Sequence, residues 1–156
     1  MSSAANWLYR VHAPSFSSSD VEHAVAVVRR HDPSGYLPGR LLPTETMQVS
    51  YYAVRSLWLQ TGLRFGELAA ADPAERLAWW QEGIDRVFGD AELSGSWDQA
   101  TFRLLKELLV TVDWDRSHFD DIIKDRAVDS QVKQYDRLED LVQHAEASCG
   151  RYVYGC

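Results

Sequence analysis

Apolar side chains recur at intervals of three and four residues along most of the chain, which places them on one face of an α-helix. No stretch alternates apolar and polar residues with a period of two, and hairpin dipeptides such as Asn-Gly are absent. The sequence therefore predicts an all-α protein of about six helices with short connections.

The helix expected over residues 44–66 carries the longest apolar stripe. Pro43 precedes it and Thr44 is a residue type that caps helices. Arg55 falls at the edge of the apolar face, where we expect it to pair with a carboxylate. This pattern predicts a central, mostly buried helix. Its main stripe is Met47, Tyr51, Val54 and Trp58, widened by Val49, Ala53 and Leu57.

Start and stop signals predict the other helices. A capping box at residues 19–22 opens a helix over 20–31, and proline and glycine then predict a break and a loop up to residue 43. Asp72 and Pro73 open a helix that runs to residue 89. Three more are expected over residues 96–112, 117–134 and 136–153.

The ends of the chain add two expectations. Residues 1–18 are rich in serine and poor in acid, which predicts a flexible segment with a targeting role ahead of a helical domain over 19–156. The last apolar stripe is still in phase at Val153, close to the end at Cys156. A helix cut in mid-pattern predicts a truncated domain or one that another chain completes.

Composition narrows the class of protein further. A chain of 156 residues fits one domain, and no apolar run approaches the length that spans a bilayer. A net charge of −7 argues against nucleic acid as a partner. The two cysteines, Cys149 and Cys156, form no disulfide framework and suit a reducing compartment.

Three aspartates form the most suggestive chemical pattern. Asp121, Asp125 and Asp129 are four residues apart, so one helical face presents three carboxylates, a group that can hold Mg²⁺ beside a diphosphate. A solvated acidic face next to Lys124 explains the same pattern more simply. The histidines are scattered and no cofactor-binding motif occurs, so we predict no metal site and no cofactor.

Six segments resemble, in the same order, those of the squalene/phytoene synthases. The resemblance covers most of residues 20–155, and its closest match is to a mitochondrial branch that assists assembly of respiratory complex I. It rests on residues 27–37, 41–43, 52–56, 76–80, 122–126 and 135–150.

The resemblance implies an isoprenoid-synthase-like fold, of which this chain has the N-terminal part. In the active enzymes an aspartate-rich, metal-binding motif follows the arginine that matches Arg55. Here residues 57–61 are Leu-Trp-Leu-Gln-Thr, and the second aspartate motif would fall beyond Cys156. Without these ligands the reaction loses its Lewis acid, so the resemblance implies a catalytically inactive protein.

Three functions follow as hypotheses. The favoured one is assembly of complex I on the matrix side of the mitochondrial inner membrane, through binding of a partner subunit or a lipid-like tail, with peripheral membrane association. The alternatives are a divergent prenyl-diphosphate transferase completed by a partner chain and a structural subunit of a mitochondrial complex. The residues expected to form a vestigial ligand site or partner surface are Tyr51, Arg55, Trp58, Asp121 and Asp125.

Overall fold

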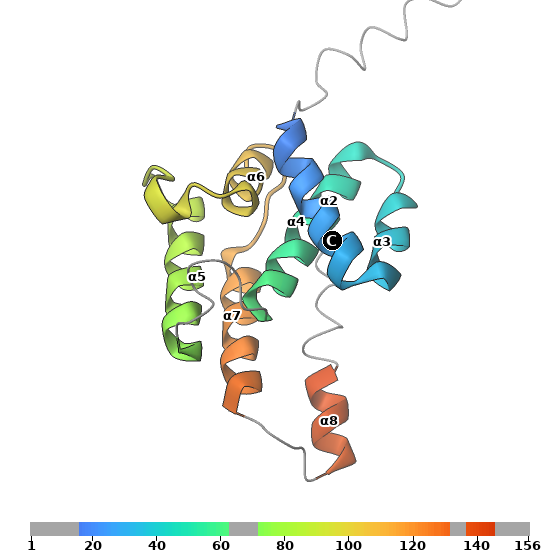
Figure 1. Ribbon diagram of the computed structural model, residues 1–156, viewed down its shortest axis with the longest axis vertical. Coiled ribbons are helices and arrows are strands. Elements are labelled where there is room, and N and C mark those ends of the chain that lie inside the picture. The colour runs from blue at the N-terminus through green and yellow to red at the C-terminus, as the bar shows by residue number, and fades with distance from the viewer. Residues whose placement is uncertain (1–15, 63–71, 132–136, 146–156) are drawn as a thin grey trace, which may run out of the picture.

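The computed structural model describes residues 16–62, 72–131 and 137–145, without the side chains of residues 129–131 and 144. Every regular element in these ranges is helical, which confirms the all-α prediction (Figure 1). The helices are α2 (Ser18–His31), α3 (Pro33–Arg40), α4 (Glu45–Gly62), α5 (Pro73–Phe88), α6 (Ala100–Leu108), α7 (Arg116–Gln131) and α8 (Leu138–Ala145), with a 3₁₀ turn η2 (Gly95–Trp97).

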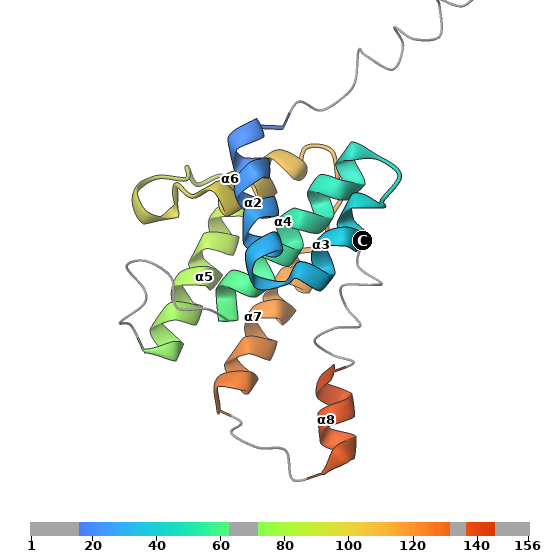
Figure 2. The ribbon, with the colours of Figure 1, turned by 45° about the vertical axis from the view of Figure 1, so that its right-hand side comes forward.

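Helix α4 lies at the centre of the bundle, as the apolar stripe predicts. It packs against α2, α3, α5, α6 and α7, and Figures 1 and 2 show it running between α3 on one side and α5 on the other. Helix α2 also packs on α6, while α5 packs on α7 and α6. The core between them is aliphatic and aromatic, and its fully buried large side chains are Val28, Leu57, Ile84, Phe102, Leu104, Leu105 and Leu108.

Two predicted helix starts are confirmed by their capping bonds. The hydroxyl of Thr44 accepts a hydrogen bond from the backbone N–H of Met47 at 3.2 Å, at the start of α4. The carboxylate of Asp72 accepts one from Ala74 at 2.9 Å, with Pro73 in the first turn of α5. Each side chain satisfies a backbone N–H that has no partner within its helix.

Two local predictions are wrong. The expected loop before α4 contains helix α3, which Asp32 caps by accepting from the backbone N–H of Gly35 at 3.0 Å. The Asp-Pro pair at residues 32–33 is the same helix-start signal that opens α5. The glycines that follow it favour a turn, so the sequence pattern predicted a loop there instead of a helix. The predicted capping box is also absent from α2, because Ser17 is the N-cap and Ser19 lies within the helix.

The burial pattern of α4 differs from the predicted one by part of a turn. Met47 is 42% exposed, and Tyr51, Val54 and Trp58 are only half-buried. The core-facing side chains are instead Val49, Tyr52, Ala53, Ser56, Leu57, Leu59 and Gln60. The residues expected only to widen the apolar face, Val49, Ala53 and Leu57, are therefore part of its buried centre.

The C-terminal helices follow the prediction less closely. Helix α6 begins at Ala100 after the η2 turn and ends at Leu108, so it is shorter at both ends than the predicted 96–112. The predictions for residues 1–15, 63–66, 132–134 and 146–153 lie outside the described residues. In both views α8 lies apart from the other helices (Figures 1 and 2). Its apolar residues Leu138, Leu141 and Val142 are 71%, 45% and 46% exposed. Within the described ranges, no helix is long and apolar enough to cross a bilayer.

Candidate functional site around Trp58

Trp58, in the last turns of α4, lies under two guanidinium groups. The central carbon of Arg55 is 4.5 Å from the centroid of the indole ring, and that of Arg126, from α7, is 4.1 Å from it. Arg126 also donates a hydrogen bond to the backbone oxygen of Trp58 at 2.8 Å. These cation–π contacts bring two predicted site residues, Arg55 and Trp58, together with an arginine that the pattern analysis did not single out.

Arg55 is paired with Asp32, the cap of α3. Its Nε donates to the Asp32 carboxylate at 2.8 Å, and an Nη lies 2.6 Å from the same oxygen. The two side chains are only 19% and 12% exposed. The predicted pairing of Arg55 with a carboxylate is therefore confirmed, and it fixes α3 to α4.

Asp32 is the most heavily hydrogen-bonded carboxylate of the site. Burial by itself would raise its pKa, but hydrogen bonds from the Ser34 hydroxyl, from Arg55 and from the Gly35 backbone outweigh burial and leave the pKa below its ordinary value. Asp32 is therefore ionised at neutral pH, and it balances the charge of the guanidinium that lies over Trp58.

Tyr51 and Tyr52 attach α3 to α4 from the other side. Their hydroxyls donate to the backbone oxygens of Gly35 and Tyr36, each at 2.7 Å. Gly39 allows this close approach, since a Cβ there would lie 2.6 Å from atoms of both tyrosine rings. The described contacts of Tyr51 thus give it a structural role in seating α3.

Of the three aspartates expected on one face of α7, the structure describes the side chains of Asp121 and Asp125. Asp121 lies 3.8 Å from Lys124 in an exposed pair, and Asp125 is half-buried. The side chain of Asp129 lies outside the described part of the structure. Within that part, no three His, Cys, Asp or Glu side chains come close enough to hold a metal ion.

The residues after Arg55 face the protein interior. Leu57, Leu59, Gln60 and Thr61 are all at most 8% exposed. Gln60 donates a hydrogen bond to the Thr101 hydroxyl at 2.7 Å, so its polar group is satisfied within the core. This segment is a packed part of the fold. It contributes no carboxylate to the group formed by Asp32, Arg55, Trp58 and Arg126, which we call the Trp58 cluster.

The Trp58 cluster offers cations, hydrogen-bond donors and an aromatic face. A guanidinium carries N–H donors and no acceptor atom, so both arginines are suited to holding an anion or a carbonyl oxygen. The cluster is therefore suited to binding rather than to acid–base chemistry. The sequence pattern did not predict Asp32 or Arg126 as members of this cluster. The helix-capping signal at Asp32 was visible in the sequence, whereas the stacking of Arg126 depends on how α7 packs on α4.

One comparison with known proteins finds a relationship. A family model described as squalene/phytoene synthase matches residues 28–156, which is most of the chain and includes every residue of the Trp58 cluster. No curated protein and no solved structure gives a significant match.

Proposed function

This chain belongs to the squalene/phytoene synthase family, and from that premise we propose that it is a non-catalytic member that assists assembly of mitochondrial respiratory complex I. In this role it binds a partner subunit or a lipid-like tail on the matrix side of the inner membrane. Its peripheral membrane association would come from that binding.

The absence of carboxylates from residues 57–61 supports the non-catalytic part of this proposal. Where the catalysts of the family are expected to hold metal-binding aspartates, this chain has Leu, Trp, Leu, Gln and Thr. Four of these side chains are buried, and Trp58 lies under the guanidiniums of Arg55 and Arg126. A carboxylate at Leu57 or Leu59 would place a charge inside the core. The packing of α4 therefore disfavours metal-binding carboxylates at these two positions.

The partner surface that we propose is the apolar face of α8, made of Leu138, Leu141 and Val142. These three side chains lie on one side of a short helix and are all substantially exposed. Exposed apolar side chains on one helix face are typical of surfaces that another protein or a lipid covers.

The proposal is tested by separating mitochondrial complexes on native gels with and without the gene for this protein. We expect the protein to migrate with partly built complex I, and its deletion to reduce the mature complex. Migration with the finished complex would instead identify a structural subunit. Migration alone, with complex I intact, would refute the assembly role.

A second measurement addresses the absence of catalysis. The purified chain is incubated with a prenyl diphosphate and Mg²⁺, and released inorganic diphosphate is measured against an active family member. We expect no release above the uncatalysed rate. Turnover that depends on Mg²⁺ would replace our proposal with the divergent transferase.

A further inference from the structure

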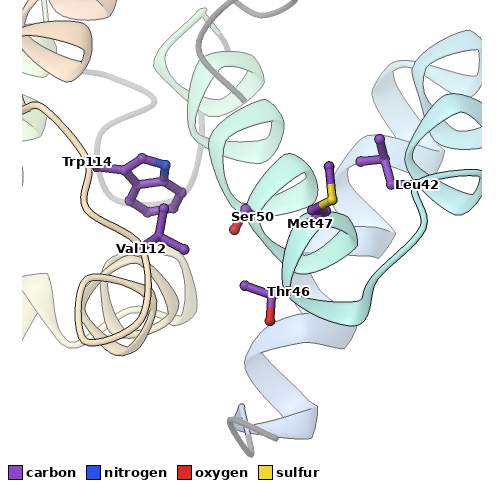
Figure 3. A pocket seen from close by; sticks show the side chains of 6 residues that line it. All are labelled: Leu42, Thr46, Met47, Ser50, Val112 and Trp114. Carbon is purple, nitrogen blue, oxygen red and sulfur yellow. The ribbon is translucent and has the colours of Figure 1, made fainter.

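A small cavity lies at the opposite end of α4 from Trp58. It has a volume of about 120 Å³ and is lined by Leu42, Thr46, Met47, Ser50, Val112 and Trp114. Figure 3 shows Val112 and Trp114, from the segment between α6 and α7, on the side of Thr46 and Ser50, with Met47 and Leu42 on the opposite side of the view. Met47 is 42% exposed, so the cavity reaches the protein surface at that residue.

The walls of the cavity are almost entirely apolar. In Figure 3 the methyl group of Thr46 points toward Val112, and its hydroxyl points away. The indole of Trp114 and the thioether of Met47 are groups that make favourable contacts with aromatic rings. An apolar cavity of about 150 Å³ is known to bind benzene, so this one is of the right size for a single six-membered ring.

Ser50 is the exception in this lining. The residue is only 8% exposed, and its buried hydroxyl has no hydrogen-bond partner among the residues that the structure describes. The buried Ser56 and Thr61 of α4, by contrast, bond back to their own helix: Ser56 donates to the backbone oxygen of Ala53 at 2.9 Å, and Thr61 donates to that of Trp58 at 2.8 Å. A buried hydroxyl without a partner costs free energy, which a ligand that bonds to it would recover.

We propose that this cavity binds a small aromatic alcohol, a single ring that carries one hydroxyl group. The ring would occupy the apolar space between Trp114 and Met47, and its hydroxyl would exchange a hydrogen bond with Ser50. Small-molecule sites have this composition, with apolar walls and a few placed polar groups. The site is distinct from the Trp58 cluster and does not depend on a role in complex I assembly.

The test uses phenol as the probe and benzene as its counterpart without the hydroxyl. Binding to the full chain is followed by NMR, through the indole N–H signal of Trp114, which is assigned with the Trp114→Phe variant. We expect both probes to shift this signal. In Ser50→Ala, phenol should bind about fivefold or more weakly, since a net hydrogen bond of about 1 kcal/mol corresponds to that factor. Benzene should bind the variant as tightly as before.

Ser56→Ala is the matched control, because it removes a buried hydroxyl from the same helix outside the cavity. We expect it to leave phenol binding unchanged and to lower the melting temperature. Ser50→Ala should not lower the melting temperature, because the Ser50 hydroxyl makes no hydrogen bond within the described part of the structure. Phenol that binds Ser50→Ala and the natural chain equally, or no shift of the Trp114 signal by either probe, would overturn the proposal.

Discussion

Asp32 shows how one residue can determine the local structure around it. Its carboxylate caps α3, accepts from the Ser34 hydroxyl and pairs with Arg55, whose guanidinium lies over Trp58. The single side chain therefore joins the start of one helix to the candidate site on the next. Loss of either partner in the Asp32–Arg55 pair leaves the other charge largely buried.

Replacement of Arg55 by alanine should destabilise the protein by about 2–4 kcal/mol, because it strands the buried Asp32 carboxylate. The measurement is the free energy of unfolding in urea. Lys124→Ala is the control, since Lys124 is 75% exposed in its pair with Asp121 and should cost less than about 1 kcal/mol. Equal effects of the two substitutions would show that the Arg55 pair is no stronger than a surface pair.

The acid stability of the protein should depend on Asp32. Its pKa is lower in the folded protein than in the unfolded chain, so ionised Asp32 contributes stability above the unfolded pKa of about 3.9. That contribution is lost as the pH falls through the folded pKa. The stability difference between the natural chain and Asp32→Asn should therefore be largest near pH 6 and should shrink below about pH 4. A difference that stays constant from pH 6 to pH 2.5 would contradict this assignment.

At the scale of helices, α5 and α6 meet closely at Gly83. A methyl group at Gly83 would overlap the ring of Phe102, which is fully buried and also contacts the rings of Trp79 and Trp80. The absence of a side chain at this position thus lets the aromatic core lie directly against the backbone of α5.

Gly83→Ala should for that reason destabilise the protein by about 1–3 kcal/mol, which is the usual cost of overpacking a core. Helix propensity alone predicts the opposite sign, a gain of about 1 kcal/mol. Thermal unfolding distinguishes the two. Ala78→Gly, at an exposed position of the same helix, calibrates the propensity effect and should cost about 1 kcal/mol. A stabilised Gly83→Ala variant would mean that Phe102 can move aside.

The helices were predictable to different degrees, for physical reasons. Apolar periodicity located α2, α4, α5 and α7, and capping residues fixed the starts of α4 and α5. Helix α3 was missed because its glycines and prolines have low helix propensity, and bonds from Tyr51 and Tyr52 add to the Asp32 cap in holding it. Tertiary contacts of this kind leave no periodic signal.

The candidate site was predictable only in part. Arg55 and Trp58 lie on one helix, three residues apart, so the sequence alone could place them together. Arg126 comes from a helix 68 residues further along, and its position depends on how α7 packs. Asp121 and Asp125 lie on the same helix as Arg126, and their membership of the site stays a prediction.

At the scale of the whole molecule, the proposed partner surface on α8 can be separated from the fold itself. Leu138 and Leu141 are exposed, so Leu138→Glu with Leu141→Glu should leave the free energy of unfolding of the bundle within about 1 kcal/mol of the natural value. The same variant should no longer migrate with partly built complex I on native gels.

The control for this pair of substitutions is Glu139→Gln with Asp140→Asn, which changes exposed polar residues on the same helix. We expect the control to retain co-migration. Co-migration of the Leu138/Leu141 variant at the natural level would show that α8 is not the partner surface. It would not affect the proposal that the chain is non-catalytic.

The ion pair between Asp20 and Arg103 has a consequence for the order in which the protein can fold during synthesis. Asp20 is 3% exposed, and both of its carboxylate oxygens accept from Arg103, 83 positions later in the chain. Until the ribosome has released residue 103, docking of α2 would bury an uncompensated charge. Stable docking of α2 therefore requires that α6 has already been synthesised, so α2 is buried later in folding than its early position in the sequence suggests.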